Sequence, residues 1–99
     1  MIINYNQEII ILISLIQTYY DAMRAFDWRE FKYHVNFDKA YEKKPQVVVS
    51  INKLDYDKNK NLRINVFAAD IDSSGFDLKI QTWDDTIIYR VTIAWISFE

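Results

Sequence analysis

The chain of 99 residues contains no cysteine, and only one glycine, one proline and one histidine. The absence of cysteine excludes disulfide bonds and thiolate metal sites, and it implies no redox compartment. With so little glycine and proline, the turns must be made by asparagine, aspartate and serine. An excess of basic residues is also lacking. The net charge of −2 argues against a protein that binds nucleic acid through a positive face.

Long hydrophobic runs are lacking as well. The longest apolar segment covers residues 9–16, whereas a membrane-spanning helix needs about 20 apolar residues. No basic residue precedes the segment and no small-x-small cleavage site follows it, so it does not resemble a signal peptide. It can be a core strand or short helix, an extension outside the domain, or a targeting segment. We expect residues 1–16 to be an N-terminal extension of uncertain role and residues 17–99 to form one domain.

Half of the residues are hydrophobic, and most of the chain shows patterns typical of β-strands. Residues 33–37, 62–71 and 76–83 alternate between apolar and polar, and residues 46–51 are rich in valine. Polar clusters at 55–61, 72–75 and 84–86 are typical of turns, and Gly75 stands where a positive φ is expected. Residues 21–33 show no clean period and are predicted to be a loop, with room for one helical turn. The fold class expected is all-β, a six-stranded antiparallel β-sandwich.

The last predicted strand, residues 87–98, is apolar on both faces. By alternation one face carries Ile88, Ala94, Ile96 and Phe98, and the other carries Tyr89, Val91, Ile93 and Trp95. Antiparallel sheets in monomeric sandwiches usually leave one face in water. The pattern therefore favours contact of the outer face with another copy of the chain. The alternative is a strand deep in the core of a monomer.

Arg63 and Trp83 are predicted on the polar faces of their strands. An exposed tryptophan is unfavourable for solubility, so a functional role for Trp83 is indicated. An indole can lie against the C–H face of a pyranose, and a guanidinium can donate to two adjacent hydroxyl groups. Tyr89 adds a ring and a hydroxyl group, and carboxylates nearby could accept from sugar hydroxyls. These residue types suit a sugar site. The alternative is that both aromatic residues pack in an oligomer interface and Arg63 forms a surface ion pair.

Other candidate sites are weaker. Asp55, Asp57 and Asn59 have the spacing of a calcium loop, but Lys60 stands where its glycine should be, so a solvated turn is expected and no metal site is assigned. Asp84 and Asp85 are adjacent, and adjacent side chains at a strand end point apart, which disfavours a catalytic carboxylate pair. His34 has no evident serine or acid near it and is expected to be structural. We therefore expect no enzymatic activity and no cofactor.

Seven short pieces occur in order over residues 33–99. They are Pro45-Gln46-Val47-Val48-Val49-Ser50-Ile51, Leu54-Asp55, Asn61-Leu62-Arg63, Gly75-Phe76, Thr82-Trp83, Ile88-Tyr89 and Trp95-Ile96-Ser97. In this order and spacing the chain resembles the H-type lectins, the family of the snail agglutinins and the C-terminal domain of discoidins. The resemblance implies a six-stranded sandwich that forms a homotrimer or a multiple of one. It also implies that galactose or N-acetylgalactosamine binds in clefts between neighbouring subunits.

The resemblance also implies roles for single residues. Arg63 matches the family's sugar-contacting arginine, Trp83 its stacking tryptophan, and Tyr89 its tyrosine. Asp84 matches the position that tunes contact with the 2-substituent, where some relatives carry histidine; a carboxylate there favours galactose or mixed specificity. Asp27 is the nearest match to the family's hydroxyl-accepting aspartate, in a shortened loop where Asp21 and Glu30 are alternatives.

The function expected is thus a non-catalytic lectin that binds glycans of glycoproteins or glycolipids and supports multivalent adhesion. We expect neither membrane insertion nor nucleic-acid binding. The alternative is a structural or oligomerisation module whose sugar site is degraded. Relatives act at cell surfaces, in secreted fluids and in the cytoplasm, so the resemblance leaves the localisation open.

Overall fold

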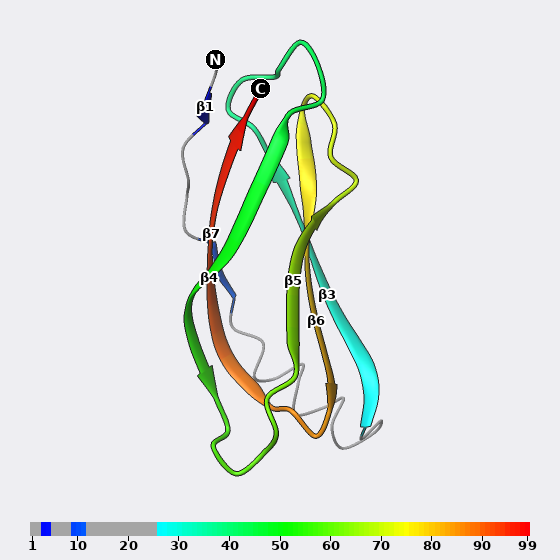
Figure 1. Ribbon diagram of the computed structural model, residues 1–99, viewed down its shortest axis with the longest axis vertical. Coiled ribbons are helices and arrows are strands. Elements are labelled where there is room, and N and C mark those ends of the chain that lie inside the picture. Colours follow the sequence, from blue (N-terminus) through cyan, green and yellow to red (C-terminus); the bar gives the residue numbers. More distant parts are fainter. Residues whose placement is uncertain (1–2, 5–8, 12–25) are drawn as a thin grey trace.

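The computed structural model describes residues 3–4, 9–11 and 26–99 of the chain. Antiparallel strands in two facing sheets make up the fold (Figure 1), which confirms the predicted all-β sandwich. The strands are β1 (Ile3–Asn4), β2 (Ile9–Ile11), β3 (Phe26–Asn36), β4 (Gln46–Tyr56), β5 (Ile64–Ala69), β6 (Gly75–Asp84) and β7 (Ile88–Phe98). The predicted count of six differs from these five long strands and two short ones.

The first sheet is built around β7. Strand β4 pairs with β7 along its whole length, and β1 and β2 follow one another along the opposite edge. Ile93, for example, lies between Ile51 of β4 and Ile9 of β2. Residues 9–11 of the apolar run are thus a strand of this sheet, while the boundary between residues 16 and 17 lies outside the described residues and stays a prediction. Within the described ranges no helix is long and apolar enough to cross a bilayer.

The second sheet has the order β3-β6-β5. The alternation predicted for β6 is confirmed, since Phe76, Leu78 and Ile80 are buried and the residues between them are not. The loop predicted for residues 21–33 is wrong from residue 26 onward, because β3 begins at Phe26. The strand escaped detection because its register shifts between Phe26 and Arg29, and because Arg29 is a charged residue on the inward face.

A second irregularity changes the predicted faces of β7. Ile88 lies opposite Tyr56 and Arg90 lies opposite Asp55, so Tyr89 is an extra residue without a partner in the ladder. The bulge places Ile88 in the core, fully buried, and leaves Tyr89 39% exposed. Ile88 therefore shares the inward face with Val91, Ile93 and Trp95, where the sequence predicted Tyr89. The two residues exchange faces because one extra residue shifts the alternation of the strand.

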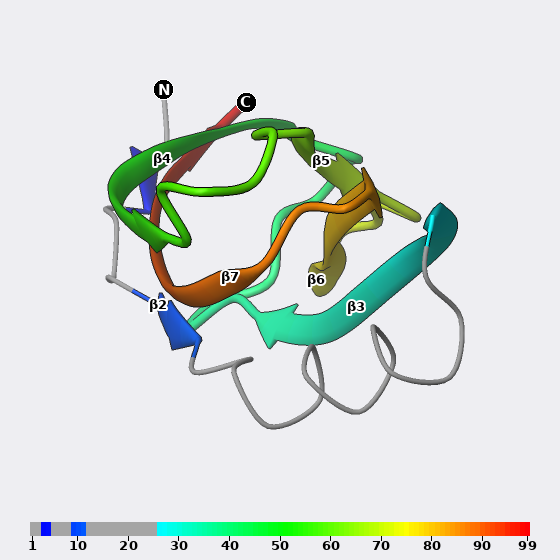
Figure 2. The ribbon, with the colours of Figure 1, turned by 90° about the horizontal axis from the view of Figure 1, so that it is seen from below.

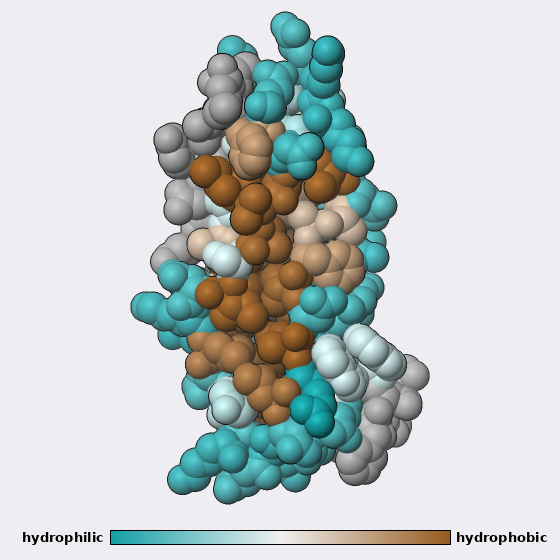
Figure 3. Space-filling view, viewed as in Figure 1, coloured by the Kyte–Doolittle hydropathy of each residue, from teal (hydrophilic) through white to brown (hydrophobic). Residues whose placement is uncertain are grey.

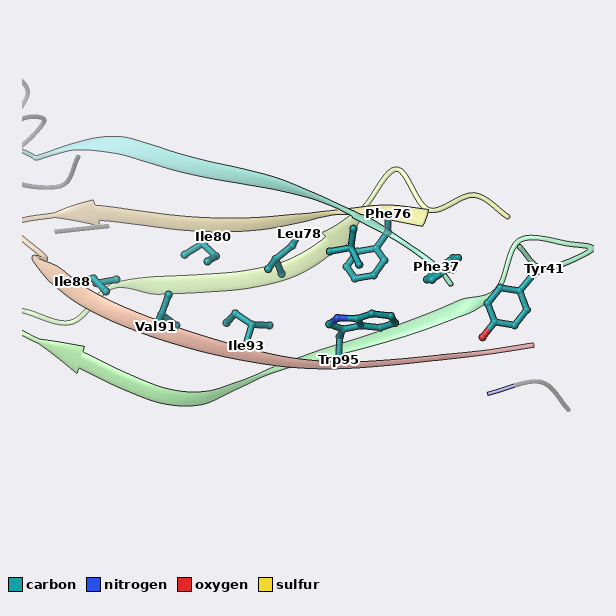
Figure 4. Close-up of a cluster of buried hydrophobic side chains, with 10 residues drawn as sticks. Phe37, Tyr41, Phe76, Leu78, Ile80, Ile88, Val91, Ile93 and Trp95 are labelled. Atoms are coloured by element: carbon teal, nitrogen blue, oxygen red, sulfur yellow. The ribbon is translucent and has the colours of Figure 1, made fainter. Parts of the chain in front are cut away.

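The core runs along the whole sandwich between the two sheets (Figure 4). Its buried hydrophobic residues are Val35, Phe37, Tyr41, Phe76, Leu78, Ile80, Ile88, Val91, Ile93 and Trp95. The aromatic members gather at one end, where Phe76 and Trp95 meet edge to face with ring centroids 5.4 Å apart. The Tyr41 hydroxyl is hydrogen-bonded to Ser97 Oγ at 2.9 Å, so this buried polar group has a partner. This end closes the core away from the predicted sugar residues.

Gly75 is required for a reason other than the one predicted from the sequence. Its φ is not positive; the positive φ values of the described residues belong to Asp70 (50°) and Asp84 (60°). A Cβ at Gly75 would lie 2.2 Å from the carbonyl oxygen of Val35, which is inside any permitted contact. The glycine thus allows β6 to approach the backbone of β3 closely, and Asp72 forms the turn before it by accepting from the Gly75 N–H at 3.0 Å.

Candidate functional site

The five residues predicted to bind sugar lie at one end of the sandwich. Strand β6 ends there with Trp83 and Asp84, β7 begins there with Tyr89 as its second residue, and Arg63 immediately precedes β5 (Figure 1, bottom). The backbone of Asp27 lies at the start of β3, next to Phe26, which pairs with Asp84. Its side chain is outside the described part of the structure. Strand topology therefore brings these chain segments to one edge of the molecule.

The turn between β6 and β7 (residues 85–87) organises this end. Thr86 is fully buried; its hydroxyl donates to the carbonyl of Asn61 at 2.6 Å and accepts from the Arg63 N–H at 2.8 Å. The Asp85 carboxylate accepts from the Asn61 N–H at 3.1 Å. The backbone of Arg63 is therefore fixed against the turn, so that its side chain starts from a defined position.

Arg29 fixes the same turn from the other side. Its side chain is buried, and its two terminal nitrogens donate to the carbonyls of Thr86 at 3.0 Å and Asp84 at 2.8 Å. Burial lowers the pKa of Arg29, while the charges of Asp84 and Asp85 oppose that shift. Sequence reasoning missed Arg29, because an arginine beside a glutamate reads as surface charge. The alternation of Phe31 and Val35, extended back along β3, would have placed it inward.

Arg63 and Trp83 flank the last paired residues of β5 and β6. Ile64 pairs with Thr82 and both belong to the inward side, so alternation assigns Arg63 and Trp83 to the outward face of the second sheet. Hydrogen bonds on the outward face join β5, β6 and β3 two residues further along the strands. Asn65 Nδ2 donates to Gln81 Oε1 at 3.3 Å, and Gln81 Nε2 donates to Glu30 Oε1 at 2.9 Å. An arginine next to an indole on one open face is a combination suited to a pyranose.

Trp28 was also missed by the sequence analysis. Its ring stacks on Trp83 with centroids 4.5 Å apart and an interplanar angle of 23°, and it is 62% exposed. It lies in the stretch of β3 opposite Trp83, where the register of the strands shifts. One face of Trp83 is therefore covered by a second indole. If Trp83 stacks on a sugar, it must do so with its other face.

Tyr89 belongs to the other sheet, and its partner is Asp57. The Tyr89 hydroxyl donates to Asp57 Oδ2 at 3.1 Å, a hydrogen bond that raises the pKa of Tyr89. The other oxygen, Asp57 Oδ1, accepts from the Asn59 N–H at 2.8 Å, which makes residues 57–60 a side-chain-stabilised turn. Among the described residues, no group of three or more histidine, cysteine, aspartate or glutamate side chains is placed to hold a metal ion.

His34 has an acid beside it, contrary to expectation. Its Nδ1 lies 2.8 Å from Asp77 Oδ1, and its Nε2 lies 3.1 Å from Asn36 Oδ1, on the outward face of the second sheet. The contact with Asp77 raises the pKa of His34 and lowers the pKa of Asp77. The pair joins β3 to β6 and is a structural cross-strand contact.

Comparison with known families identifies the domain. The model of the H-type lectin domain matches residues 32–98. The chain belongs to the H-type lectin family. This H-type lectin is also similar to a Fuscovulum blasticum protein described as "ATP synthase subunits region ORF 7", with 33% identity over 69 residues. The alignment covers 70% of this chain and 60% of that protein.

The fold of this H-type lectin is that of discoidin II from Dictyostelium discoideum. Two discoidin II structures superimpose with TM-scores of 0.78 and 0.73, at 23% and 24% sequence identity. Each superposition covers 97% of this chain but only 36% and 38% of the discoidin II chain. The chain therefore spans well under two thirds of the length of these relatives. The comparisons thus show an H-type lectin domain with the fold of discoidin II.

Proposed function

We propose that this H-type lectin binds terminal galactose or N-acetylgalactosamine in clefts between the subunits of a homotrimer. The observation that carries the proposal is that Arg63 and Trp83 are next to the paired, inward-facing Ile64 and Thr82 at one end of the second sheet, so that alternation assigns both to its outward face. The pair stands at the end of the sandwich where the β6–β7 turn is held from both sides. Such fixed backbone lets a site hold its side chains in place without ordering them anew when ligand binds.

Each residue has a chemical role in this proposal. Arg63 donates to two adjacent sugar hydroxyls, and Trp83 offers an indole to the C–H face of the ring. Asp27 accepts hydroxyl protons. Asp84 contacts the substituent at the 2-position, where a carboxylate prefers a hydroxyl to a methyl group. Tyr89, whose own proton is engaged by Asp57, offers its ring and its oxygen lone pairs as selectivity contacts.

The trimer is supported by an open side of the sandwich. Strands β4 and β5 lie next to each other at this side (Figure 2), but no ladder of hydrogen bonds joins them. A hydrophobic strip, here called the apolar band, therefore runs along the long axis (Figure 3). Its half-buried residues on β4 and β5 are Val47, Val49, Leu54, Ile64, Val66 and Ala68. An apolar surface of this kind marks an interaction site.

A subunit boundary would also explain why the predicted residues are divided between the sheets. Arg63 and Trp83 belong to the side of β5 and β6, whereas Tyr89 belongs to β7. A cleft between two copies can combine residues from both sheets. Binding of a single sugar is expected to be weak, because each hydroxyl gives up water when it binds. Several sites engaging one glycosylated surface can add about 10² to 10⁴ in avidity.

A structural or oligomerisation module is the second candidate, and Trp28 favours it. With Trp28 stacked on Trp83, one face of the platform is occupied without any ligand. In that case the trimer would form but Trp83→Ala would leave binding to glycan-coated surfaces unchanged.

Calorimetric titration with galactose, N-acetylgalactosamine and glucose tests the proposal. The wild type is expected to bind the two galacto sugars and not glucose. Arg63→Ala is expected to lower the affinity at least tenfold, since charged hydrogen bonds contribute about 1.5–3 kcal/mol. Lys43→Ala removes an exposed positive charge from the loop before β4 and serves as the matched control. Equal affinity in wild type and Arg63→Ala would refute the assigned role of Arg63.

A further inference from the structure

Trp28 is a large exposed side chain for which the proposed sugar contacts give no role. Its ring is 62% exposed, yet it is stacked on Trp83 with the centroids only 4.5 Å apart. An isolated exposed tryptophan is unfavourable in water, and a pair formed only for packing would bury both rings. The stack therefore indicates that Trp28 acts on the position of the Trp83 ring.

The order of strands in the second sheet determines which side chains flank Trp83. A polar row runs from Asn65 on β5 through Gln81 on β6 to Glu30 on β3, and its hydrogen bonds fix that order. Beyond this row, Trp28 of β3 stacks on Trp83 of β6 across the register shift, and Arg63 immediately precedes β5, whose first residue pairs with Thr82. Trp83 thus has Trp28 on the side of β3 and the start of β5, preceded by Arg63, on the other side.

The spacing shows how the two rings stand. Neighbouring strands lie about 4.8 Å apart, and the indole centroids lie 4.5 Å apart with a small interplanar angle. Rings that stack face to face at the strand spacing must rise from the sheet with their faces turned along the row. Trp28 then covers the face of Trp83 that looks toward β3. The opposite face of Trp83 looks toward β5 and Arg63.

The position of Trp28 is itself fixed. The register of β3 shifts between Phe26 and Arg29, and Arg29 holds the strand to the β6–β7 turn through its bonds to Asp84 and Thr86. Trp28 is attached directly to this clamp. It can therefore act as a rigid support rather than as a side chain that moves with Trp83.

We propose that Trp28 is a positioning residue that holds the Trp83 indole upright, so that a pyranose stacks on the uncovered part of that indole with its hydroxyls toward Arg63. The inference rests on the proposed function of Arg63 and Trp83. Without Trp28 the Trp83 ring would be free to turn down toward β3, and ordering it again would weaken binding of the sugar. The support adds no contact with the sugar itself, so its effect comes from preorganisation.

The test is the sign of the change in affinity for galactose and N-acetylgalactosamine in Trp28→Ala. Positioning predicts that affinity falls by about three- to tenfold, the contribution of one aromatic pair. It also predicts that Trp28→Phe, which keeps a stacking ring, restores most of the affinity. Acrylamide quenching of Trp83 should increase in Trp28→Ala and decrease again when sugar binds. Tyr33→Ala, another exposed aromatic residue on β3, is the control and should bind as the wild type does.

Other outcomes overturn the inference in distinct ways. Higher affinity in Trp28→Ala would mean that Trp28 blocks Trp83. Unchanged affinity, with binding lost in Trp83→Ala, would mean that Trp83 needs no support while the proposed function stands. If the wild type binds neither sugar, the proposed function fails and the inference with it.

Discussion

At the scale of single residues, Arg29 joins three segments of the chain that meet at the candidate site. Its fork of donors reaches the carbonyl of Asp84, the last residue of β6, and that of Thr86 in the β6–β7 turn, and the Thr86 hydroxyl accepts from the Arg63 N–H. Only arginine can serve both carbonyls, because its donors are held in one rigid plane. The stability of this end and the placement of Arg63 therefore depend on one buried charge.

Replacing Arg29 should affect both stability and binding. Arg29→Met leaves the carbonyls of Asp84 and Thr86 without these donors, at a cost of about 1–3 kcal/mol. Each kcal/mol corresponds to a fall in melting temperature of roughly 4–8 °C for a domain of this size. Lys32→Met, on the exposed face of the same strand, controls for the loss of positive charge. Thermal unfolding of the three proteins gives the answer, and equal melting temperatures would refute the clamp.

At the scale of strands, β3 and β6 are joined by the pair His34 and Asp77, which makes their association depend on pH. The contact raises the pKa of His34 above its ordinary value of about 6.5 and lowers the pKa of Asp77 below about 3.9. His34 contributes stability at pH below its unfolded pKa, and this is lost as pH rises through the raised folded value. Asp77 contributes above its unfolded pKa, and this is lost as pH falls through the lowered folded value.

The pair should therefore stabilise the fold most between about pH 4 and pH 6.5. We expect the difference in melting temperature between wild type and His34→Gln to be largest in this window and to shrink by pH 8. Since His34 is exposed, the difference should be small, and added salt should reduce it. A difference that stays constant from pH 4 to pH 8 would show that the ion pair contributes nothing.

Strand patterns also show how far the sequence predicts this fold. The alternation in β6 identifies its inward face correctly, because residues 75–82 pair in regular register with β3, and residues 77–82 also pair with β5. Prediction fails where an extra residue breaks the alternation, at Tyr89 in β7 and before Arg29 in β3. Local patterns contain no sign of these bulges, since they arise from the pairing of strands distant in sequence.

The candidate site divides along the same line. The sequence predicts Arg63 and Trp83 on polar faces because the strands alternate up to them; Arg63 is exposed and Trp83 is half-buried. The stacking of Trp28 on Trp83 could not be predicted, because it depends on the register beyond the bulge. The bond from Tyr89 to Asp57 likewise joins residues brought together only by the turn that follows β4.

At the scale of the whole molecule, the sandwich is thin and open along one side. Its extents are 45 × 21 × 18 Å, and its radius of gyration of 14.8 Å exceeds the value of about 13 Å expected for a compact domain of 100 residues. Ile51 illustrates the consequence. By alternation with Val47 and Val49 it belongs to the inward face of β4, yet it is 39% exposed. Association of the apolar band with other copies would cover such residues.

A charge at Ile51, which stands on β4 between Val49 and Leu54 of the apolar band, should prevent association. We expect the wild type to have the mass of three chains by light scattering, and Ile51→Lys to have the mass of one, because a buried unpaired charge is strongly disfavoured. Lys53→Ala, two residues along β4, should leave the mass unchanged. Since the site is proposed to lie between subunits, Ile51→Lys should also lose sugar binding. A folded wild-type monomer would refute the trimer.

The end of the sandwich around Arg63 and Trp83 is proposed to bind galacto sugars, and tryptophan fluorescence tests this binding most directly. Of the three tryptophans, Trp28 and Trp83 lie at this end, while Trp95 is buried in the core at 6% exposure. Titrating the wild type with N-acetylgalactosamine, galactose and glucose should shift the emission with the first two sugars and not with glucose. An emission spectrum that responds to none of the three, or equally to all of them, would contradict the account.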